Sequence, residues 1–354
     1  MSATVQSEQA KPARKRRVQG DTWVSKTFFT AMAGIVVLVI VAIILFVASR
    51  AFQSFTVYHL NPLDFFLGTK YNPYECDIPD APCHVGIFIL IVGSFLSTLL
   101  AVILSTPIAL AVAIFVSEIA PARGRQFMQP ILELLTGIPS IIYGILAVLL
   151  VVPLVREAYN FVAGGFFSNG FGLVAAAIVL AIMILPTITT LSIDALRSLP
   201  NGLREASLAL GATRWETIRK TLLPAGMTGI TTGVILGMGR AIGETLAVAF
   251  VIGGAAGKFP FGFTDQWPFI KFFPTSSITV QILFDFKEAA NPSTTYSVVW
   301  TLAFVLLVIS FLFVVLSRWV ASRSVYNTMR SPRARPRLWP RLRELAGTVK
   351  GGQS

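Results

Sequence analysis

Charged residues are scarce in this chain of 354 residues, making up only 13% of it, whereas 54% of its residues are hydrophobic. Globular domains usually contain about 25% charged residues. Several apolar runs reach roughly 20 residues or more, the length that crosses a bilayer as a helix. A soluble globule could bury one such run but not six, so the composition indicates a polytopic membrane protein.

Cysteine and histidine are equally scarce, with two of each and neither a CxxC nor an HExxH motif. We therefore predict no metal site and no metal enzyme. Cys76 and Cys83 lie together in one hydrophilic loop, and we predict a disulfide between them if that loop faces an oxidising compartment. A metal site in this loop is the alternative, but one short loop lacks the spaced ligand pairs of known sites.

Two further motifs are missing. No A-x-A cleavage site follows the first apolar run, 28–47, which is also too long for a signal peptide, so we interpret it as a retained anchor. The string Gly253–Lys258 resembles a phosphate-binding loop but is one residue short, and Phe259 follows where serine or threonine is required. The chain is therefore not expected to hydrolyse ATP.

The apolar runs predict an all-α membrane protein with six transmembrane helices. Proline is expected to kink the second span at Pro107 and the fourth at Pro186. The predicted spans are Thr27–Ser49, Val85–Ser117, Phe127–Val155, Phe171–Ala195, Ala225–Gly253 and Tyr296–Val320.

The net charge of +12 would at first suggest a nucleic-acid partner, but its distribution does not. With both termini in the cytoplasm, 22 of the 29 lysines and arginines lie on the cytoplasmic side, six lie outside, and Arg240 lies in the membrane. This asymmetry fixes the orientation by the positive-inside rule. The predicted regions are a basic cytoplasmic tail (1–26), a transmembrane domain (27–320) with an outside loop (51–84) and a cytoplasmic loop (196–224), and a second basic tail (321–354).

The outside segment 258–275 is aromatic and interrupted by proline, which is typical of chain lying at the membrane interface. The cytoplasmic loop 196–224 is predicted to form two short helices joined by a bend at Gly211. Thr213 and Glu216 have the spacing of a capping box for the second helix, which should stop at Pro224. An ordinary linker would also have these features.

Span five contains Arg240 and Glu244, four residues apart and so on one face of a helix. Arg240 lies roughly 22 Å along a helix from the start of the span, near the bilayer midplane. The pair could fix helix packing, or Arg240 could offer its planar fork of donors to an oxyanion while Glu244 holds it at rest. Charged groups at this depth are costly, which favours the second interpretation.

Two glycine-containing stretches are also informative, one in the same span as this pair and one in span three. Gly229, Gly233 and Gly237 repeat every four residues, a pattern that lets another helix approach closely, and we assign that helix to a partner subunit. In span three, Gly137 and Pro139 should break the helix and free backbone groups to line a cavity. The neighbouring Thr136 and Ser140 are candidate hydroxyl donors to a substrate.

The cytoplasmic loop resembles the EAA loop of ABC-importer permeases. The order Glu205-Ala206-Ser207, then Gly211, then Leu223-Pro224 matches the spacing of that motif throughout, although Ser207 and Thr221 depart from its residue types. In that family the loop docks into a separate ATP-binding subunit. The resemblance implies that ATPase coupling involves Glu205, Ala206, Gly211, Leu223 and Pro224.

The strings ELLTGIPSIIYG, REASLALGATRWETI and GRAIGETLAV together resemble the permeases of high-affinity phosphate importers, the C-type more than the A-type. The resemblance implies the six-helix, MetI-like fold of type I importers in a bacterial inner membrane. It also implies a substrate path at Arg240 and Glu244, and a complex with an A-type permease, two ATPase subunits and an extracytoplasmic phosphate-binding protein. ATP and Mg²⁺ would bind the ATPase subunits, and this chain would hold no cofactor.

Other functions remain open on the sequence alone. A permease for another oxyanion, such as sulfate or molybdate, would suit the same arginine. A secondary transporter or anion channel acting alone has no use for a docking loop. A membrane scaffold without a transport path would leave Arg240 without a purpose.

Overall fold

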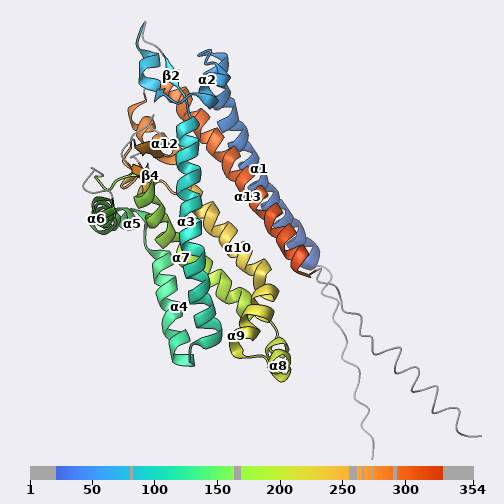
Figure 1. Ribbon diagram of the computed structural model, residues 1–354. Helices are drawn as coiled ribbons and strands as arrows, with labels where there is room; N and C mark the ends of the chain where they lie inside the picture. The colour runs from blue at the N-terminus through green and yellow to red at the C-terminus, as the bar shows by residue number, and fades with distance from the viewer. Residues whose placement is uncertain are drawn as a thin grey trace, which may run out of the picture.

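A computed structural model describes residues 21–79, 83–162, 169–254, 261–264, 267–272, 275–289 and 293–329. This part of the chain is mainly helical and includes six helical segments long and apolar enough to cross a membrane, as predicted. Figure 1 shows their arrangement. The helices are α1 (Asp21–Thr56), α2 (Pro62–Leu67), α3 (Phe88–Ile114), α4 (Ala122–Gly137), α5 (Ser140–Leu146), α6 (Val152–Val162), α7 (Leu173–Arg197), α8 (Asn201–Ala209), α9 (Arg214–Thr217), α10 (Leu223–Ile242), α11 (Leu246–Ala249), α12 (Ile278–Glu288) and α13 (Thr294–Met329).

Short elements of other kinds join or extend these helices. A 3₁₀ turn spans Pro73–Asp77. Wider, π-helical turns lie at the end of α3, between α5 and α6, and between α9 and α10; they are Phe115–Ile119, Ala147–Val151 and Ile218–Leu222. Two antiparallel strand pairs are β1–β2 (Tyr71–Asn72 with His84–Val85) and β3–β4 (Phe261–Thr264 with Trp267–Phe272).

The centre of the bundle is the pair α3 and α7, which make the most extensive contact in the fold, and α10 packs against both. Helix α7 is the most deeply buried of the six candidate spans among the described residues. Its buried side chains are mostly small or aliphatic, so neighbouring helices can approach it closely. The other helices of the core therefore pack against α7. These buried residues include Ala175, Ala176, Val179, Leu180, Met183, Ile184 and Ile188.

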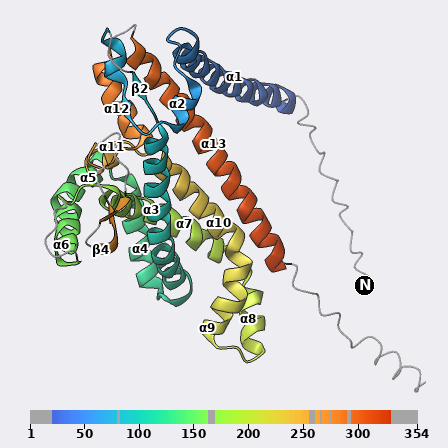
Figure 2. The ribbon, with the colours of Figure 1, turned by 45° about the horizontal axis from the view of Figure 1, so that its top comes forward.

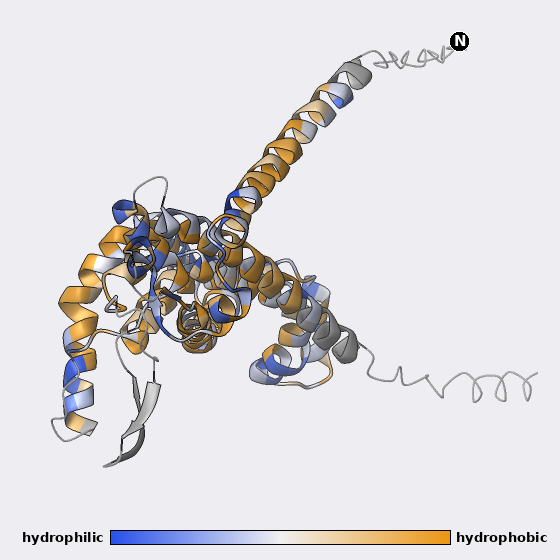
Figure 3. Cartoon of the chain, turned by 90° about the horizontal axis from the view of Figure 1, so that it is seen from above, coloured by the Kyte–Doolittle hydropathy of each residue, from blue (hydrophilic) through white to orange (hydrophobic). Residues whose placement is uncertain are grey.

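Helices α1 and α13 form the edge of the molecule. They contact each other near the end that holds α2, where Ser54 Oγ is hydrogen-bonded to Ser297 Oγ at 2.9 Å and to Thr301 Oγ1 at 2.7 Å. From there α1 runs away from the bundle, and it is apolar along most of its length (Figures 2 and 3). The side chains of its apolar stretch are exposed in the single chain. An apolar helix without protein cover on most sides is suited to lipid.

The described residues of the predicted outside loop, 51–79 and 83–84, pack over α12 and α13. Its cysteines, Cys76 and Cys83, are joined by a disulfide. Asp285 of α12 is fully buried and accepts hydrogen bonds from the hydroxyl groups of Tyr71 and Tyr74 and from Gln281. Burial raises the pKa of Asp285, and these hydrogen bonds oppose the rise.

Asp77, next to the disulfide, caps a helix far away in the chain. Its carboxylate accepts hydrogen bonds from the backbone N–H groups of Thr294 and Thr295, at 2.7 and 3.3 Å, and from the Thr295 hydroxyl at 2.8 Å. These groups form the first turn of α13, whose N–H groups have no partner within the helix. The loop therefore supplies both a hydrogen-bond acceptor and a negative charge to the start of the last span.

Several predicted boundaries are wrong. Span three does not begin at Phe127, because the chain breaks after Gly137 and the apolar span begins at Ser140; the preceding helix α4 is a separate element with polar side chains on one side. Helix α3 is continuous through Pro107 and widens only at the π-helical turn after Ile114. Within the predicted interfacial segment 258–275, the described residues 261–264 and 267–272 form the antiparallel strands β3 and β4, and its location at the membrane interface stays a prediction. Residues 1–20 and 330–354, most of both predicted tails, lie outside the described residues.

We predict that Asp77→Ala lowers the stability of the protein by about 1 kcal/mol, the usual cost of removing a helix cap. Burial raises the pKa of the Asp77 carboxyl, but the hydrogen bonds from Thr294 and Thr295 outweigh it and hold that pKa below its usual range. The stabilisation is therefore complete above the ordinary carboxyl pKa and is lost as the pH falls through the lowered pKa of the folded state. Thermal unfolding in detergent should show a constant difference between wild type and variant near neutral pH, and a shrinking one below about pH 4. A difference that widens on acidification would contradict this role.

Candidate functional site

Close packing against α7 positions α10, on which Arg240 lies. A Cβ atom added to Gly229 would lie 2.4 Å from the Ala195 Cβ, and one added to Gly237 would lie 2.8 Å from the Ile188 side chain. Only glycine allows this approach of the two helices. The glycine repeat therefore packs α10 against α7 of the same chain, and the prediction that it receives a partner subunit is wrong.

Arg240 lies two residues before the end of α10 and is partly buried. Its Nη1 donates a hydrogen bond of 3.3 Å to the hydroxyl oxygen of Thr187, which follows Pro186 in α7. Within the described residues, no carboxylate lies within ion-pair distance of this guanidinium. One hydrogen bond to a neutral hydroxyl leaves most of the five N–H donors of the arginine available to a ligand.

Glu244 is not on the same helix face as Arg240, which corrects the prediction of an i,i+4 pair. Helix α10 ends at Ile242 with Gly243 as its C-cap, and the chain turns before α11 begins at Leu246. The carboxylate of Glu244 instead accepts a hydrogen bond of 3.2 Å from the backbone N–H of Ala247, at the start of α11. Span five, predicted as one helix from Ala225 to Gly253, is thus broken after Ile242, two residues beyond Arg240.

Polar contacts from other elements hold this break in place. The hydroxyl of Thr279 in α12 donates a hydrogen bond of 3.0 Å to the backbone carbonyl of Glu244. Helix α12 is in turn joined to α3, because the backbone N–H of Ile278 donates to Ser94 Oγ at 2.9 Å. A Cβ at Gly93 would lie 2.3 Å from the Ser276 carbonyl oxygen, so α3 and this loop touch through their backbones. These contacts join the turn after α10 to α12 and α3.

The second break, between α4 and α5, contains the other candidate residues. As predicted, the helix is interrupted at Gly137 and Pro139. The Thr136 hydroxyl donates to the carbonyl of Leu132 within its own helix at 2.8 Å, and Ser140 is partly buried at the start of α5. The structure brings neither of these hydroxyl groups into hydrogen-bond contact with Arg240.

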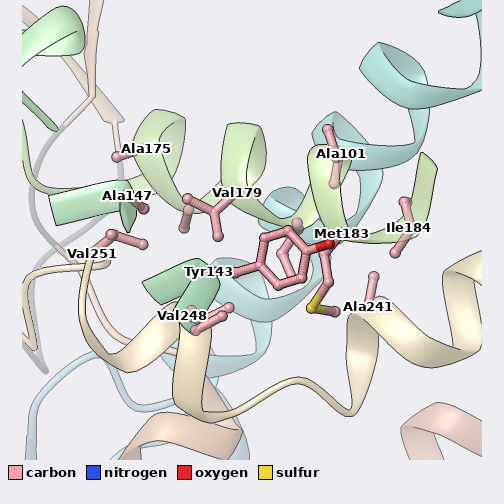
Figure 4. Close-up of a cluster of buried hydrophobic side chains, with 14 of the residues drawn as sticks. Ala101, Tyr143, Ala147, Ala175, Val179, Met183, Ile184, Ala241, Val248 and Val251 are labelled. Atoms are coloured by element: carbon pink, nitrogen blue, oxygen red, sulfur yellow. The ribbon is translucent and has the colours of Figure 1, made fainter. Parts of the chain in front are cut away.

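Tyr143 connects the two breaks. Its hydroxyl donates a hydrogen bond of 2.7 Å to the carbonyl of Leu135, across the α4–α5 interruption. Its ring lies in the central cluster beside α7, close to Met183, Ala241 and Val248 (Figure 4). Because Ala241 follows Arg240 directly, the Tyr143 ring packs beside the helix turn that contains the arginine.

The loop between α7 and α10 contains the predicted glycine bend and capping box. Gly211 has a φ of +85°, which L-amino acids with a side chain rarely adopt. The capping box of Thr213 and Glu216 is confirmed, with both of its reciprocal hydrogen bonds present. Glu205 and Ala206 are exposed on α8. Large apolar side chains near them are also exposed, namely Leu208 (46%), Leu210 (88%) and Trp215 (58%). An exposed apolar group of this kind on a polar loop is typical of a protein-binding surface.

The prediction that the second helix of this loop stops at Pro224 is wrong. Helix α9 continues through the π-helical turn 218–222 into α10, and Pro224 occupies the first turn of α10. Proline has no N–H to donate to the preceding turn, and it lies here just after the π-helical turn, where the regular hydrogen-bond pattern of the α-helix is already interrupted. Leu223 and Pro224 are both partly buried. The loop is therefore joined by a continuous helical path to the span that contains Arg240.

Sequence reasoning missed three residues that shape the site: Thr187, Tyr143 and Arg204. Arg204 on α8 binds both carboxylate oxygens of Glu118, at 2.7 and 3.1 Å, and so connects this loop to the end of α3. The threonines that follow Pro186 in an otherwise apolar span were a signal for Thr187. Nothing in the local sequence pairs Glu118 with Arg204, because 86 residues separate them.

Comparison with known proteins identifies the family. The model of the family described as "Binding-protein-dependent transport system inner membrane component" matches residues 105–326. The "Probable ABC transporter permease protein YqgH" of Bacillus subtilis is 40% identical over 319 residues, covering 90% of this chain and 96% of that protein. The "Phosphate transport system permease protein PstC" of Mesorhizobium japonicum is 34% identical over 310 residues, covering 83% and 88% respectively.

The fold is also found in a solved structure. A chain of the bacterial alginate ABC transporter, in complex with an alginate-bound periplasmic protein, superposes with a TM-score of 0.54 over 88% of this chain and 99% of that one, at 13% identity. At this identity the likeness concerns the fold alone. The family match, the similar permeases and the six-span fold agree: the chain belongs to the family of binding-protein-dependent transport system inner membrane components, as a permease component of an ABC importer.

Proposed function

We propose that this chain is the C-type permease of an ATP-driven phosphate importer. The observation that supports this most directly is Arg240, a partly buried guanidinium at a helix break with one neutral hydrogen-bond partner. The planar fork of arginine matches the oxygens of a phosphate. Relatives named as phosphate transport permeases, such as that of Haemophilus influenzae, at 32% identity over 86% of this chain, support the choice of phosphate. Arg240 itself would also suit sulfate or molybdate, which uptake competition would distinguish.

The partners follow from the same proposal. A second permease completes the path, and an extracytoplasmic phosphate-binding protein delivers the anion. Separate ATPase subunits hold ATP and Mg²⁺ and dock on α8 and α9, where Glu205, Ala206 and the exposed Leu208, Leu210 and Trp215 are available for contact. Motion of that docking surface reaches Arg240 through the continuous helical path from α9 into α10. In this assembly the present chain performs no catalysis.

The proposed orientation places both termini and α8 in the cytoplasm, with the disulfide loop outside, in a bacterial inner membrane. Cysteine labelling of intact cells tests it in a variant with both native cysteines replaced. We expect a membrane-impermeant thiol reagent to label a cysteine at Thr69 and to spare one at Arg214 until the cells are lysed. The opposite pattern would reverse the topology.

Arg240→Ala is expected to abolish phosphate uptake, and Arg240→Lys to reduce it strongly, because lysine keeps the charge but loses the fork. Uptake of radioactive phosphate is measured in cells that contain the complex at wild-type level. Thr187→Val is the matched control, since it removes the hydroxyl partner of Arg240 while leaving the guanidinium in place; it should retain most uptake. Normal uptake by a fully assembled Arg240→Ala complex would contradict a role for Arg240 in anion transport and leave it a role in helix packing only.

Gly211→Ala is expected to weaken association with the ATPase subunits about tenfold while leaving membrane insertion intact. The added Cβ meets no atom within 4 Å, so the cost comes from the positive φ, roughly 1–2 kcal/mol. Gly202→Ala on α8 is the matched control, because its Cβ is equally free of contact and its φ is not in the left-handed region. Co-purification of the ATPase with each variant gives the measurement. Equal recovery with both variants would refute a role for this bend in docking.

A further inference from the structure

A polar cavity of about 500 Å³ lies beneath the α8–α9 loop, where α3 and α7 end. It is distinct from Arg240, which lies near the far end of α10. Four of the lining side chains are arginines and one, Glu118, is a carboxylate. The lining residues are Ser117, Glu118, Arg125, Arg197, Asn201, Arg204, Leu208, Arg214, Thr217, Ile218 and Leu222.

Two of the four arginines have structural partners. Arg204 binds Glu118 and also donates to the carbonyls of Leu196 and Leu199, at the C-terminal end of α7, at 2.9 and 3.1 Å. Arg125 donates to the carbonyls of Ser117 and Ala120, at the end of the π-helical turn that follows α3. Both arginines thus satisfy carbonyl groups that a helix leaves without partners where it ends.

The other two arginines, Arg197 at the end of α7 and Arg214 at the start of α9, have no such role. Within the described residues, neither forms an ion pair or a side-chain hydrogen bond. Both carboxylate oxygens of Glu118 are already bound by Arg204. Arg197 and Arg214 are both exposed, so solvent reaches their guanidinium groups. The cavity lining therefore has more positive than negative side chains, and these two guanidinium groups are available to a ligand.

We propose that this cavity binds a phosphate group, either as inorganic phosphate or as the headgroup of an anionic phospholipid. Two arginines from different elements are suited to grip such an anion through charge-assisted, bidentate hydrogen bonds. Basic pockets between membrane helices at the cytoplasmic side are also where anionic headgroups bind. The bound phosphate joins Arg197 of α7 to Arg214 of α9, and so holds the docking loop against the core.

The positive-inside rule accounts for the number of basic residues at this end of the protein but not for their convergence. Topology depends on the total of lysine and arginine near the span ends, wherever their side chains point. Arg123 and Arg219 meet that requirement while lying outside the cavity, and they are exposed like Arg197 and Arg214. They provide a matched control, because replacing them removes the same charge from the same end of the protein.

The test uses the purified complex with its partner subunits, comparing Arg197→Gln/Arg214→Gln with Arg123→Gln/Arg219→Gln. Equilibrium dialysis with radioactive inorganic phosphate measures the free anion, and native mass spectrometry counts phosphatidylglycerol and cardiolipin retained after detergent extraction. Loss of one charge-assisted contact weakens binding about tenfold, so we expect a loss of roughly a hundredfold in the cavity variant. The control pair should bind like the wild type.

The two assays separate the two sources of phosphate. Weaker dialysis binding in the cavity variant, with wild-type binding in Arg240→Ala, assigns the site to inorganic phosphate. Loss of retained anionic phospholipid assigns it to a lipid headgroup. Equal results for cavity variant and control in both assays would overturn the proposal. Should the glutamine pair fail to assemble, Arg197→Lys/Arg214→Lys keeps both charges without the forks. Wild-type binding by that variant in both assays would exclude recognition by the guanidinium groups. Neither assay depends on phosphate being the cargo at Arg240.

Discussion

Backbone groups freed at a helix break must find hydrogen-bond partners inside the protein, because the bilayer offers none. This constraint explains much of the polar chemistry in an otherwise apolar chain. At the α4–α5 break, Tyr143 binds the carbonyl of Leu135; after α10, Thr279 binds the carbonyl of Glu244. Arg125 and Arg204 do the same at the ends of α3 and α7. At each of these places a polar side chain meets a carbonyl group where a helix ends or is interrupted.

The same constraint separates structural polar groups from those available to a ligand. Thr136 and Glu244, both assigned to the substrate path by sequence reasoning, bond to backbone groups of their own segments, so their hydrogen-bonding capacity is at least partly committed. Arg240 differs because it lies in the last turn of α10, where the helix ends, and its guanidinium donates a hydrogen bond to a single neutral hydroxyl. A charge left in this state is costly within a membrane unless water or an anion reaches it. Its position at the break, rather than a partner four residues later, is what favours the transport role.

The sequence predicted what depends on composition and local patterns. The six spans, the break at Gly137 and Pro139, the bend at Gly211 and the Thr213–Glu216 capping box all follow from hydropathy and from glycine, proline and cap chemistry. It did not predict what depends on distant partners. The break after Ile242 interrupts an apolar run with no proline, and it is held by Thr279 from another helix. The glycine repeat correctly predicted that another helix packs closely against α10, but only the fold shows that this helix is α7.

The arginines show why charge counting alone could not find the cavity near α8. All four of its arginines count equally toward the positive-inside rule. Arg125 and Arg204 donate hydrogen bonds to carbonyl groups at helix ends, and Arg204 also binds Glu118. Arg197 and Arg214 have no such partners within the described residues. Glu118 serves Arg204 alone, so the remaining charge is uncompensated within the described residues. A basic group that closes a helix end has its donors occupied, whereas Arg197 and Arg214, both exposed, have theirs available to a ligand. Since these two lie on α7 and α9, an anion bound by both, as we propose, joins the bundle core to the loop on which we place the ATPase subunits.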